Sequence, residues 1–131
     1  MTHKKKTNIE KPLTEVELEL MNVIWDLEEC TVKDVQTRLP EGRDLAYTSV
    51  ATIMKILEQK GAVSSHKAER AHIYQPIISR TVYEAASLRH LANNLFHGDP
   101  SSMVMRLLSD NKLSQDELQM IRKILDERMG K

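Results

Sequence analysis

The sequence predicts a mainly α-helical fold with one small β-hairpin. Three stretches with apolar residues at helical spacing come first, a short β-prone segment follows, and three further helical stretches complete the chain. Only 4 Gly and 4 Pro occur among the 131 residues, so helix is the expected majority state. This length suits one domain, or one small domain with an appendage.

The first helix is expected to begin after Thr14, because Thr14 and Glu17 have the spacing of a capping box. Leu20, Ile24 and Leu27 then recur on one helical face. These residues predict an amphipathic helix of about four turns that packs one face against a core.

The second and third helices follow closely. Thr31 is expected to cap a short helix over residues 32–39, and a longer helix is expected over residues 46–60. Its inward face would carry Val50, Ile53, Met54 and Leu57. Gly61 then occupies the position where a left-handed residue commonly ends a helix.

Residues 62–67 and 72–76 change to a β-prone pattern and predict a hairpin whose turn contains residues 68–71. Pro76 indicates that the second strand ends at a sheet edge. Three helices followed by a two-stranded hairpin is the order of the winged helix-turn-helix fold.

Three later helices are predicted, with caps at Thr81, Ser102 and Ser114. Glu84 and Glu117 would complete capping boxes with the first and last of these residues. We therefore expect a flexible tail over residues 1–12, a winged-helix domain over residues 13–78, and a separate helical region over residues 79–131.

The zero net charge, from 19 basic and 19 acidic residues, argues against a bulk polyelectrolyte binder but hides an uneven distribution. Residues 1–11 hold four Lys and one Glu, and residues 12–30 hold six acids without a base. Residues 46–72 hold four basic and two acidic side chains, a net charge of +2. The third helix and the hairpin therefore have a modest positive excess.

The polar face of the third helix is suited to a DNA major groove. Thr48, Thr52 and Lys55 fall on one face, and Tyr47 and Ser49 lie near the start of the helix. Small hydroxylated side chains allow a helix to lie deep in a groove, and a lysine can reach phosphate. The alternative is a solvated polar face without a partner.

The hairpin tip adds a second basic group, with His66, Lys67, Arg70 and His72. In a winged helix this loop lies over the neighbouring backbone or minor groove, where Arg70 could enter the groove or bind a phosphate. The alternative is an ordinary charged turn.

Several segments together resemble the penicillinase-repressor (BlaI/MecI/CopY) family of winged-helix transcriptional regulators. They are Leu18…Met21…Ile24-Trp25, Thr31 to Val35, Leu45 to Ile53, Lys60-Gly61, Glu69 to Tyr74, and Ser102-Met103-Val104. The resemblance extends from about Leu13 to Met129 and implies a homodimeric cytoplasmic repressor that binds inverted-repeat operators.

The resemblance also assigns roles to residues. It implies that Tyr47, Thr48, Ser49 and Thr52 meet bases or nearby phosphates, and that Lys55 and Arg70 meet the backbone. Lys67 is a further candidate for a DNA contact, because of its charge at the hairpin tip. It places the dimer interface after Ser79. The apolar residues expected there are Leu88, Leu91, Leu95, Met103, Leu107, Leu118, Ile121 and Leu125.

The apolar pattern supports this dimer interface independently, because a single-layer appendage cannot hide so much apolar surface. The alternative is that these helices fold back on the winged helix.

The inducing signal is not predicted. In the β-lactam-responsive branch, cleavage would fall near Met105-Arg106-Leu107, but the Asn-Phe pair of that branch is absent here. The copper-responsive branch uses a C-terminal Cys-x-Cys pattern, and residues 126–131 hold no cysteine. A sensor or protease partner therefore remains unidentified.

Other functions have less support. The sequence has no Gly-rich phosphate loop, no His-x-x-x-His pattern and no nucleophile motif, so we expect neither an enzyme nor a cofactor. No apolar stretch approaches the roughly 18 residues that span a bilayer. The single cysteine, Cys30, fits a reducing compartment.

Two rival hypotheses stay open. One is a protein-interaction module that docks through the acidic first helix. The other is a metal sensor built on histidine pairs, either His66 with His72 or His90 with His97.

Overall fold

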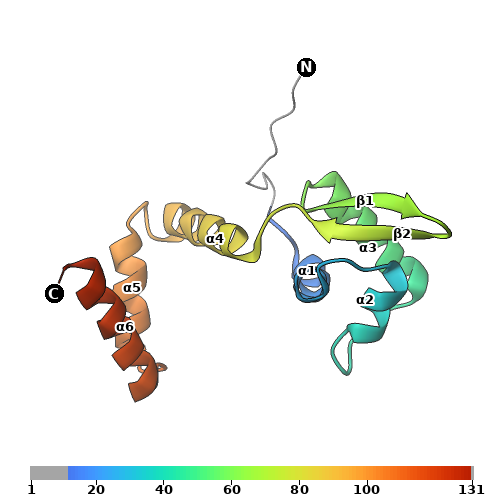
Figure 1. Cartoon of the computed structure of the whole chain (residues 1–131). Helices are drawn as coiled ribbons and strands as arrows, with labels where there is room; N and C mark the ends of the chain where they lie inside the picture. Colours follow the sequence, from blue (N-terminus) through green and yellow to red (C-terminus); the bar gives the residue numbers. More distant parts are fainter. Residues whose placement is uncertain (1–11, 131) are drawn as a thin grey trace. The chain divides into compact units, whose positions relative to one another are not determined.

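The computed structural model describes residues 12–130, which form six helices and one hairpin (Figure 1). The elements are α1 (Glu15–Leu27), α2 (Val32–Arg38), α3 (Tyr47–Gln59), β1 (Val63–Ala68), β2 (Ala71–Pro76), α4 (Arg80–Leu95), α5 (Pro100–Ser109) and α6 (Gln115–Arg128). This order confirms the predicted fold class. The tail expected before Pro12 lies outside the described residues.

The described chain divides into two compact units between Ser87 and Leu88, so the division falls inside α4. The first unit contains α1, α2, α3, the hairpin and the first two turns of α4. The second contains the rest of α4 with α5 and α6.

The core of the first unit lies between the three helices and the hairpin. Its fully buried side chains include Leu20, Met21, Ile24, Val35, Val50, Met54, Leu57 and Ile78. The predicted inward faces of α1 and α3 are therefore confirmed, except that Leu27 and Ile53 are only partly buried against the same cluster. Each fully buried side chain of this size contributes about 1.5–3 kcal/mol to folding.

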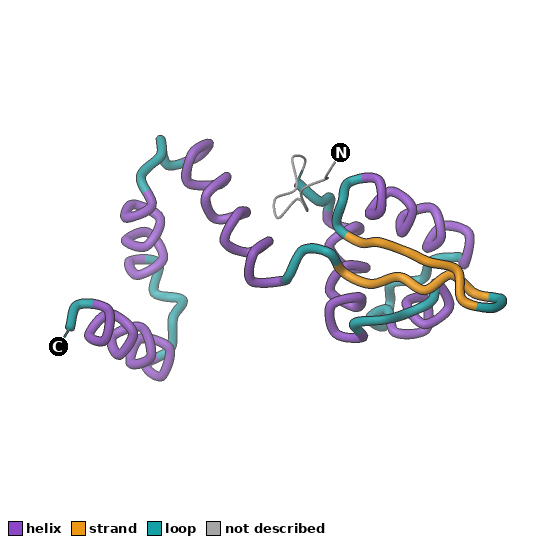
Figure 2. The backbone as a smooth tube through the Cα atoms, turned by 45° about the horizontal axis from the view of Figure 1, so that its top comes forward, coloured by secondary structure: helices purple, strands orange, loops and turns teal. Residues whose placement is uncertain are grey.

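The hairpin is formed by two adjacent strands, drawn in orange in Figure 2. It is antiparallel, and its register runs from Val63 opposite Pro76 to Ala68 opposite Ala71. Only Glu69 and Arg70 lie between the strands. A two-residue hairpin turn requires a residue with positive φ, which is usually glycine. Here Glu69 takes this conformation, with a φ of 54°.

A backbone bridge fixes the hairpin to the segment between α1 and α2. The Tyr74 amide donates to the Cys30 carbonyl at 2.7 Å, and the Cys30 amide donates to the Tyr74 carbonyl at 3.0 Å. The start of α2 is thereby held beside the middle of β2.

The end of α3 has the predicted glycine termination. Gly61 has a φ of +85°, the Ala62 amide donates to the Leu57 carbonyl, and the Gly61 amide donates to the Glu58 carbonyl. This pair of bonds is a Schellman motif, which turns the chain directly into β1.

Two predicted helix caps are wrong. The α4 helix begins at Arg80, and the Ser79 hydroxyl, rather than Thr81, accepts a hydrogen bond from the Val82 amide at 3.1 Å. The serine two residues before Thr81 already has the small hydroxyl that a cap needs, so the box of Thr81 with Glu84 does not form.

The second error concerns Ser102. The α5 helix begins at Pro100, and the Asp99 carboxylate caps it by accepting from the Ser101 amide at 3.1 Å. Proline at the first helical position is preorganised for this start, so the helix begins two residues before Ser102. The predicted Ser114 cap and its box with Glu117 are confirmed.

Candidate nucleic-acid interface

The surface of α3 opposite the core carries the predicted recognition residues. Thr48, Thr52 and Lys55 are exposed, as are Tyr47 and Ser49 in the first turn. The helix has its cap position at Ala46, which provides no side-chain hydrogen bond to the first-turn amides. The burial of Val50, Met54 and Leu57 orients the polar face outward.

Thr52 already has one internal hydrogen bond. Its hydroxyl donates to the Thr48 carbonyl at 2.9 Å, one turn back along α3. This bond orients the side chain, and the residue as a whole is exposed. The side chain can therefore accept a hydrogen bond from a base or contact a thymine methyl group.

A hollow of about 420 Å³ lies beside this face. Its lining residues come from the start of α2, from α3, and from the turn and strand β2, and they are Thr31, Val32, Lys33, Tyr47, Ala51, Lys55, Arg70, Ala71, His72 and Tyr74. The hollow brings three predicted residues together, Tyr47, Lys55 and Arg70. The other four, Thr48, Ser49, Thr52 and Lys67, do not line it.

Lys33 and Tyr74 were missed by the sequence reasoning. Lys33 follows the Thr31 cap by two residues, and this position at the start of a helix was the only local signal for it. Tyr74 gave no signal, because the alternation of β2 predicts only that it faces the core.

The cations around the hollow are not neutralised by neighbouring acids. Among the described residues, the nearby Asp34 carboxylate accepts from the Thr31 amide at 2.9 Å. The Glu58 carboxylate accepts from the Ser65 hydroxyl at 2.7 Å. Neither acid forms an ion pair with a lining lysine or arginine within the part of the chain that the structure describes.

The acids of α1 form most of the internal ion pairs instead. Glu17 pairs with Lys60 at 2.7 Å, Glu19 with Arg43 at 2.6 Å, and Asp26 with Arg80 at 2.9 Å. Three of the six acidic side chains in residues 12–30 therefore have their negative charge balanced by a basic side chain from another part of the chain.

Burial sets the protonation of two groups near the hollow. Burial raises the pKa of the Tyr74 hydroxyl, with additional contributions from Glu58, Tyr47 and Cys30. Tyr74 therefore keeps its proton. Burial and the charge of Asp34 raise the pKa of the Cys30 thiol to about 11.

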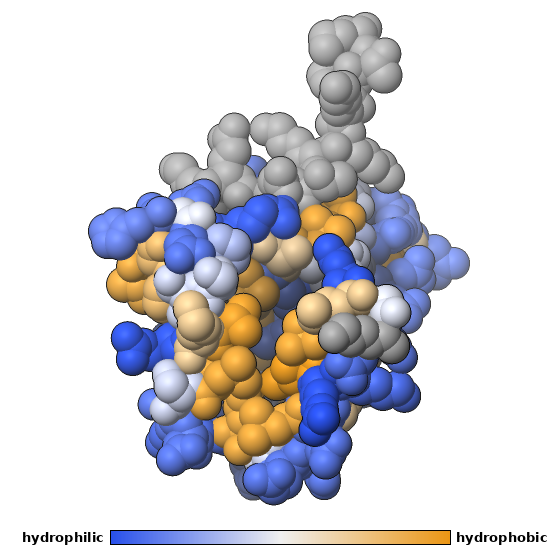
Figure 3. Space-filling model, turned by 90° about the vertical axis from the view of Figure 1, so that its left-hand side faces the viewer, coloured by the Kyte–Doolittle hydropathy of each residue, from blue (hydrophilic) through white to orange (hydrophobic). Residues whose placement is uncertain are grey.

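The second unit has a different surface. Of the residues predicted for the dimer interface, Leu88, Leu91, Leu95, Leu107 and Leu125 are exposed, and Met103, Leu118 and Ile121 are partly buried. Further apolar side chains are exposed here that the sequence reasoning did not select, namely Val104, Met105, Leu108, Met120, Ile124 and Met129. Apolar side chains gather over broad areas in the view toward this end of the chain (Figure 3).

The described helices of this unit have little interior of their own. Neither α5 nor α6 contains a buried residue, and Ala92 is the buried residue of α4. Exposed apolar surface of this extent is typical of interaction sites in general.

The proposed histidine pairing on the hairpin is wrong. His66 lies opposite Ile73, and His72 lies opposite Lys67, so the two histidines occupy neighbouring register positions. Neighbouring positions on paired strands face opposite sides of a sheet. Over residues 12–130 no group of three or more His, Cys, Asp or Glu side chains could hold a metal ion.

No helix among residues 12–130 is both long and apolar enough to cross a membrane.

The chain is similar in sequence to known proteins. The profile of the family described as "Penicillinase repressor" matches residues 13–127. The penicillinase repressor of Bacillus licheniformis is 29% identical over 115 residues, which cover 88% of this chain and 90% of that protein. The transcriptional regulator BlaI of Mycobacterium tuberculosis is 38% identical over 69 residues, which cover 52% of this chain and 50% of that protein.

One solved structure extends the likeness to three dimensions. The solution structure of the DNA binding domain of the repressor BlaI superposes with a TM-score of 0.50 and 29% sequence identity. The match covers 61% of this chain and 94% of that domain.

Proposed function

The chain belongs to the penicillinase repressor family, and we propose from this membership that it is a sequence-specific DNA-binding transcriptional repressor acting as a homodimer. The observation that carries the proposal is the exposed face of α3, which stands beside a hollow lined by cations from three elements. Its role is binding rather than catalysis, and its place of action is the cytoplasm, where the chromosome of a bacterial repressor lies.

In this proposal, residues 13–78 bind the duplex and α3 enters the major groove. Tyr47, Thr48, Ser49 and Thr52 meet base edges or nearby phosphates, because they line the exposed start of the helix. The short side chains of Thr48, Ser49 and Thr52 allow the helix backbone to approach the bases closely.

Three basic residues bind the backbone, and they are Lys55 on α3, Lys67 on β1 and Arg70 in the hairpin turn. All three are exposed. Such contacts fix the register of the protein on the duplex and supply affinity without reading the sequence.

Residues 79–131 form the dimer interface in this proposal. The support is the exposed apolar surface of α4, α5 and α6, which a second copy of the chain would cover. A two-fold dimer presents two α3 helices and therefore requires an inverted-repeat operator, with half-sites about one helical turn or a small multiple apart.

The rival proposal, docking of a protein through the acidic first helix, is less well supported. Glu17, Glu19 and Asp26 are engaged by Lys60, Arg43 and Arg80. A partner that used these acids would first have to break internal ion pairs.

The test is selection of bound duplexes from a random pool, followed by gel retardation of the enriched sequence. We expect an inverted repeat to be enriched, and we expect affinity to fall with salt at a slope of roughly −0.9 per neutralised phosphate. Binding with no enriched repeat and no salt dependence would overturn the proposal.

A further inference from the structure

We propose that Gln36 on α2 is a positioning residue for α3: its side-chain amide fixes the Leu45 carbonyl just before the helix begins, and this bond determines how accurately α3 discriminates between DNA sequences. The inference rests on the proposed function. It adds a residue that acts on sequence discrimination through the backbone of α3, without contact to a base.

The connection that leads into α3 is long for a helix-turn-helix. It runs over residues 39–46, whereas such turns commonly have about three or four residues. Within it, the Arg43 amide donates to the Pro40 carbonyl at 3.0 Å, and Gly42 has a φ of +89°. A longer connection has more backbone freedom, so the start of α3 depends on bonds to neighbouring elements for its position.

The first turn of α3 also lacks a side-chain cap. Its cap position is Ala46, which forms no side-chain hydrogen bond, although Ser, Thr, Asp and Asn are preferred there. The other five helices of residues 12–130 each begin with a side-chain cap, from Thr14, Thr31, Ser79, Asp99 and Ser114. The helix with the predicted base contacts therefore begins without the local anchor that the others have.

Gln36 supplies a bond at this point from the preceding helix. Its Nε2 atom donates to the Leu45 carbonyl at 3.1 Å, and the two residues are nine positions apart. Gln36 is half-buried and follows Val35, which is fully buried in the core, so the amide projects from a fixed part of α2. Leu45 directly precedes the cap position, and its side chain packs partly buried against the core. The bond thus ties the backbone at the start of α3 to α2.

A second attachment lies earlier in the connection. The Arg43 guanidinium bonds both oxygens of the Glu19 carboxylate on α1, with Nη2–Oε2 at 2.8 Å and Nε–Oε1 at 2.6 Å. Arg43 is exposed, and exposed ion pairs contribute little. It is also two residues further from the helix than Leu45. The bond from Gln36 is therefore the closer constraint on where α3 begins.

The effect on DNA binding follows from the positions of the predicted contacts. Thr48 and Ser49 come three and four residues after Leu45, and a hydrogen bond to a base edge requires a donor–acceptor distance of about 2.7–3.2 Å. Lys55 and Arg70 have long side chains that can adjust to a small shift of the helix, and phosphate contacts do not read sequence. Loss of the Gln36 bond should therefore reduce discrimination between sequences more than affinity for DNA in general.

The experiment compares the wild type with Gln36→Met, which keeps a side chain of similar length but has no donor. Two duplexes of about 30 base pairs are used at the same salt concentration: the repeat that the wild type enriches from a random pool, and a shuffled sequence of the same composition. We expect the ratio of the two affinities to fall about tenfold, as for one lost base contact. Affinity for the shuffled duplex should change less than about twofold.

This ratio separates positioning from stability. Partial unfolding would lower both affinities by the same factor and leave the ratio unchanged. Gln36→Asn, which remains polar but is one methylene too short to keep the bond, is the second variant and should lose the ratio as Q36M does. Circular dichroism at the temperature of the assay should show wild-type helix content for at least one of the two.

Two further variants serve as controls. Thr37→Val is matched to Gln36, because Thr37 is its neighbour on α2 and its hydroxyl donates to the Asp34 carbonyl within the same helix at 3.0 Å. It also loses one side-chain hydrogen bond but should keep the wild-type ratio. Gln36→Lys restores a donor and should keep most of the ratio, since its added charge strengthens binding to both duplexes alike.

The results that would contradict the inference are distinct from those that would contradict the proposed function. An unchanged ratio in a folded Q36M or Q36N, an equal loss in T37V, or an equal loss in Q36K would overturn the positioning role and leave the proposed function intact. A wild-type protein that enriches no repeat and prefers neither duplex would overturn both.

Discussion

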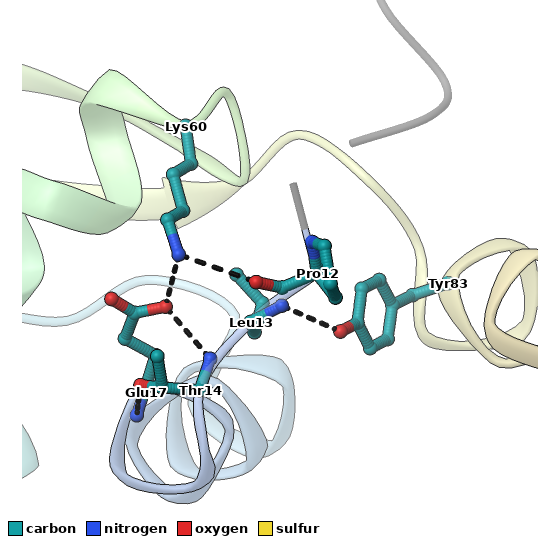
Figure 4. Close-up of polar contacts among 6 residues, drawn as sticks. All are labelled: Pro12, Leu13, Thr14, Glu17, Lys60 and Tyr83. Atoms are coloured by element: carbon teal, nitrogen blue, oxygen red, sulfur yellow. Dashed lines mark hydrogen bonds and ion pairs between the residues drawn. The ribbon is translucent and has the colours of Figure 1, made fainter. Parts of the chain in front are cut away.

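Lys60 Nζ lies 2.7 Å from Glu17 Oε1 and joins the end of α3 to the first turn of α1, residues 43 positions apart (Figure 4). The same ammonium donates to the Pro12 carbonyl at 3.3 Å, and the Thr14 amide donates to Glu17 Oε1 at 2.9 Å. Beside them, the Leu13 amide donates to the Tyr83 hydroxyl of α4 at 3.0 Å. The start of the described chain is thus fixed to three helices of the first unit.

Glu17→Gln tests the ion pair. Glutamine keeps the shape of the side chain and can still accept from the Thr14 amide, but it leaves the Lys60 ammonium without its counter-charge. We expect the free energy of unfolding in urea to fall by about 1–3 kcal/mol. Glu19→Gln, which breaks the more exposed pair with Arg43, should change it by less than about 1 kcal/mol. If the two substitutions lowered the free energy of unfolding equally, burial of the Glu17–Lys60 pair would contribute nothing to stability.

Acid stability should depend on Glu17. Burial raises the pKa of this carboxyl, but the hydrogen bonds from Lys60 and Thr14 and the charge of Lys60 outweigh it, so the net pKa is lowered. The carboxylate therefore stabilises the fold fully above its unfolded-state pKa, and this stabilisation is lost as the pH falls through the folded-state pKa. The difference in unfolding free energy between wild type and E17Q should shrink over that range, and a constant difference would contradict the assignment.

Cys30 should be unreactive in the folded protein. Burial and Asp34 raise the pKa of its thiol to about 11, and only the thiolate reacts with Ellman's reagent. We expect labelling at pH 8 to be slow without denaturant and rapid in concentrated urea. Rapid labelling of the native protein would mean that the Cys30–Tyr74 bridge opens frequently.

Trp25 should stabilise the junction between α1 and α4. Its indole N–H donates to the Ile78 carbonyl at 2.9 Å, and the Arg80 guanidinium lies 5.1 Å from the ring centroid. Trp25→Phe should lower the free energy of unfolding by about 1–3 kcal/mol, because the carbonyl loses its partner. A double-mutant cycle with Arg80→Gln should give a coupling of about 0.5–1 kcal/mol, and strict additivity would exclude the cation–π contact.

The dimer proposal predicts a monomer after Leu125→Asp. A charge in the centre of an apolar interface cannot be solvated when the second copy covers it. Light scattering should give the mass of one chain for this variant and of two for the wild type. Gln119→Asp, an exposed polar position on the same helix, should remain dimeric. A monomeric wild type would refute the dimer.

The parts of the fold that the sequence predicted are those set by local interactions. Thr14 and Glu17, or Ser114 and Glu117, are three residues apart, so their capping boxes can be recognised without knowledge of the rest of the chain. The same local rule went wrong at Thr81, because Ser79 was an equally good cap two residues earlier.

The hollow could not be predicted in this way. Lys33, Lys55 and His72 belong to three elements, and only the packing of α2, α3 and β2 brings them together. A sequence pattern identifies which residues share the face of one element, but not which elements meet. Arg70 and Lys55 were selected for their charge and position, whereas Tyr74 was not, because the alternation of a strand does not show which hollow a buried side chain lines.

The scarcity of buried side chains in α5 and α6 has a consequence for regulation in the cell. Helices that bury almost nothing within one chain derive their order from what they bind, so on the proposed dimer their folding is a bimolecular reaction. The fraction of chains in which α5 and α6 are ordered then depends on the concentration of the protein in the cell. Dilution of the protein would release the operator and also loosen the very segment that joins the two copies, leaving it open to proteolysis.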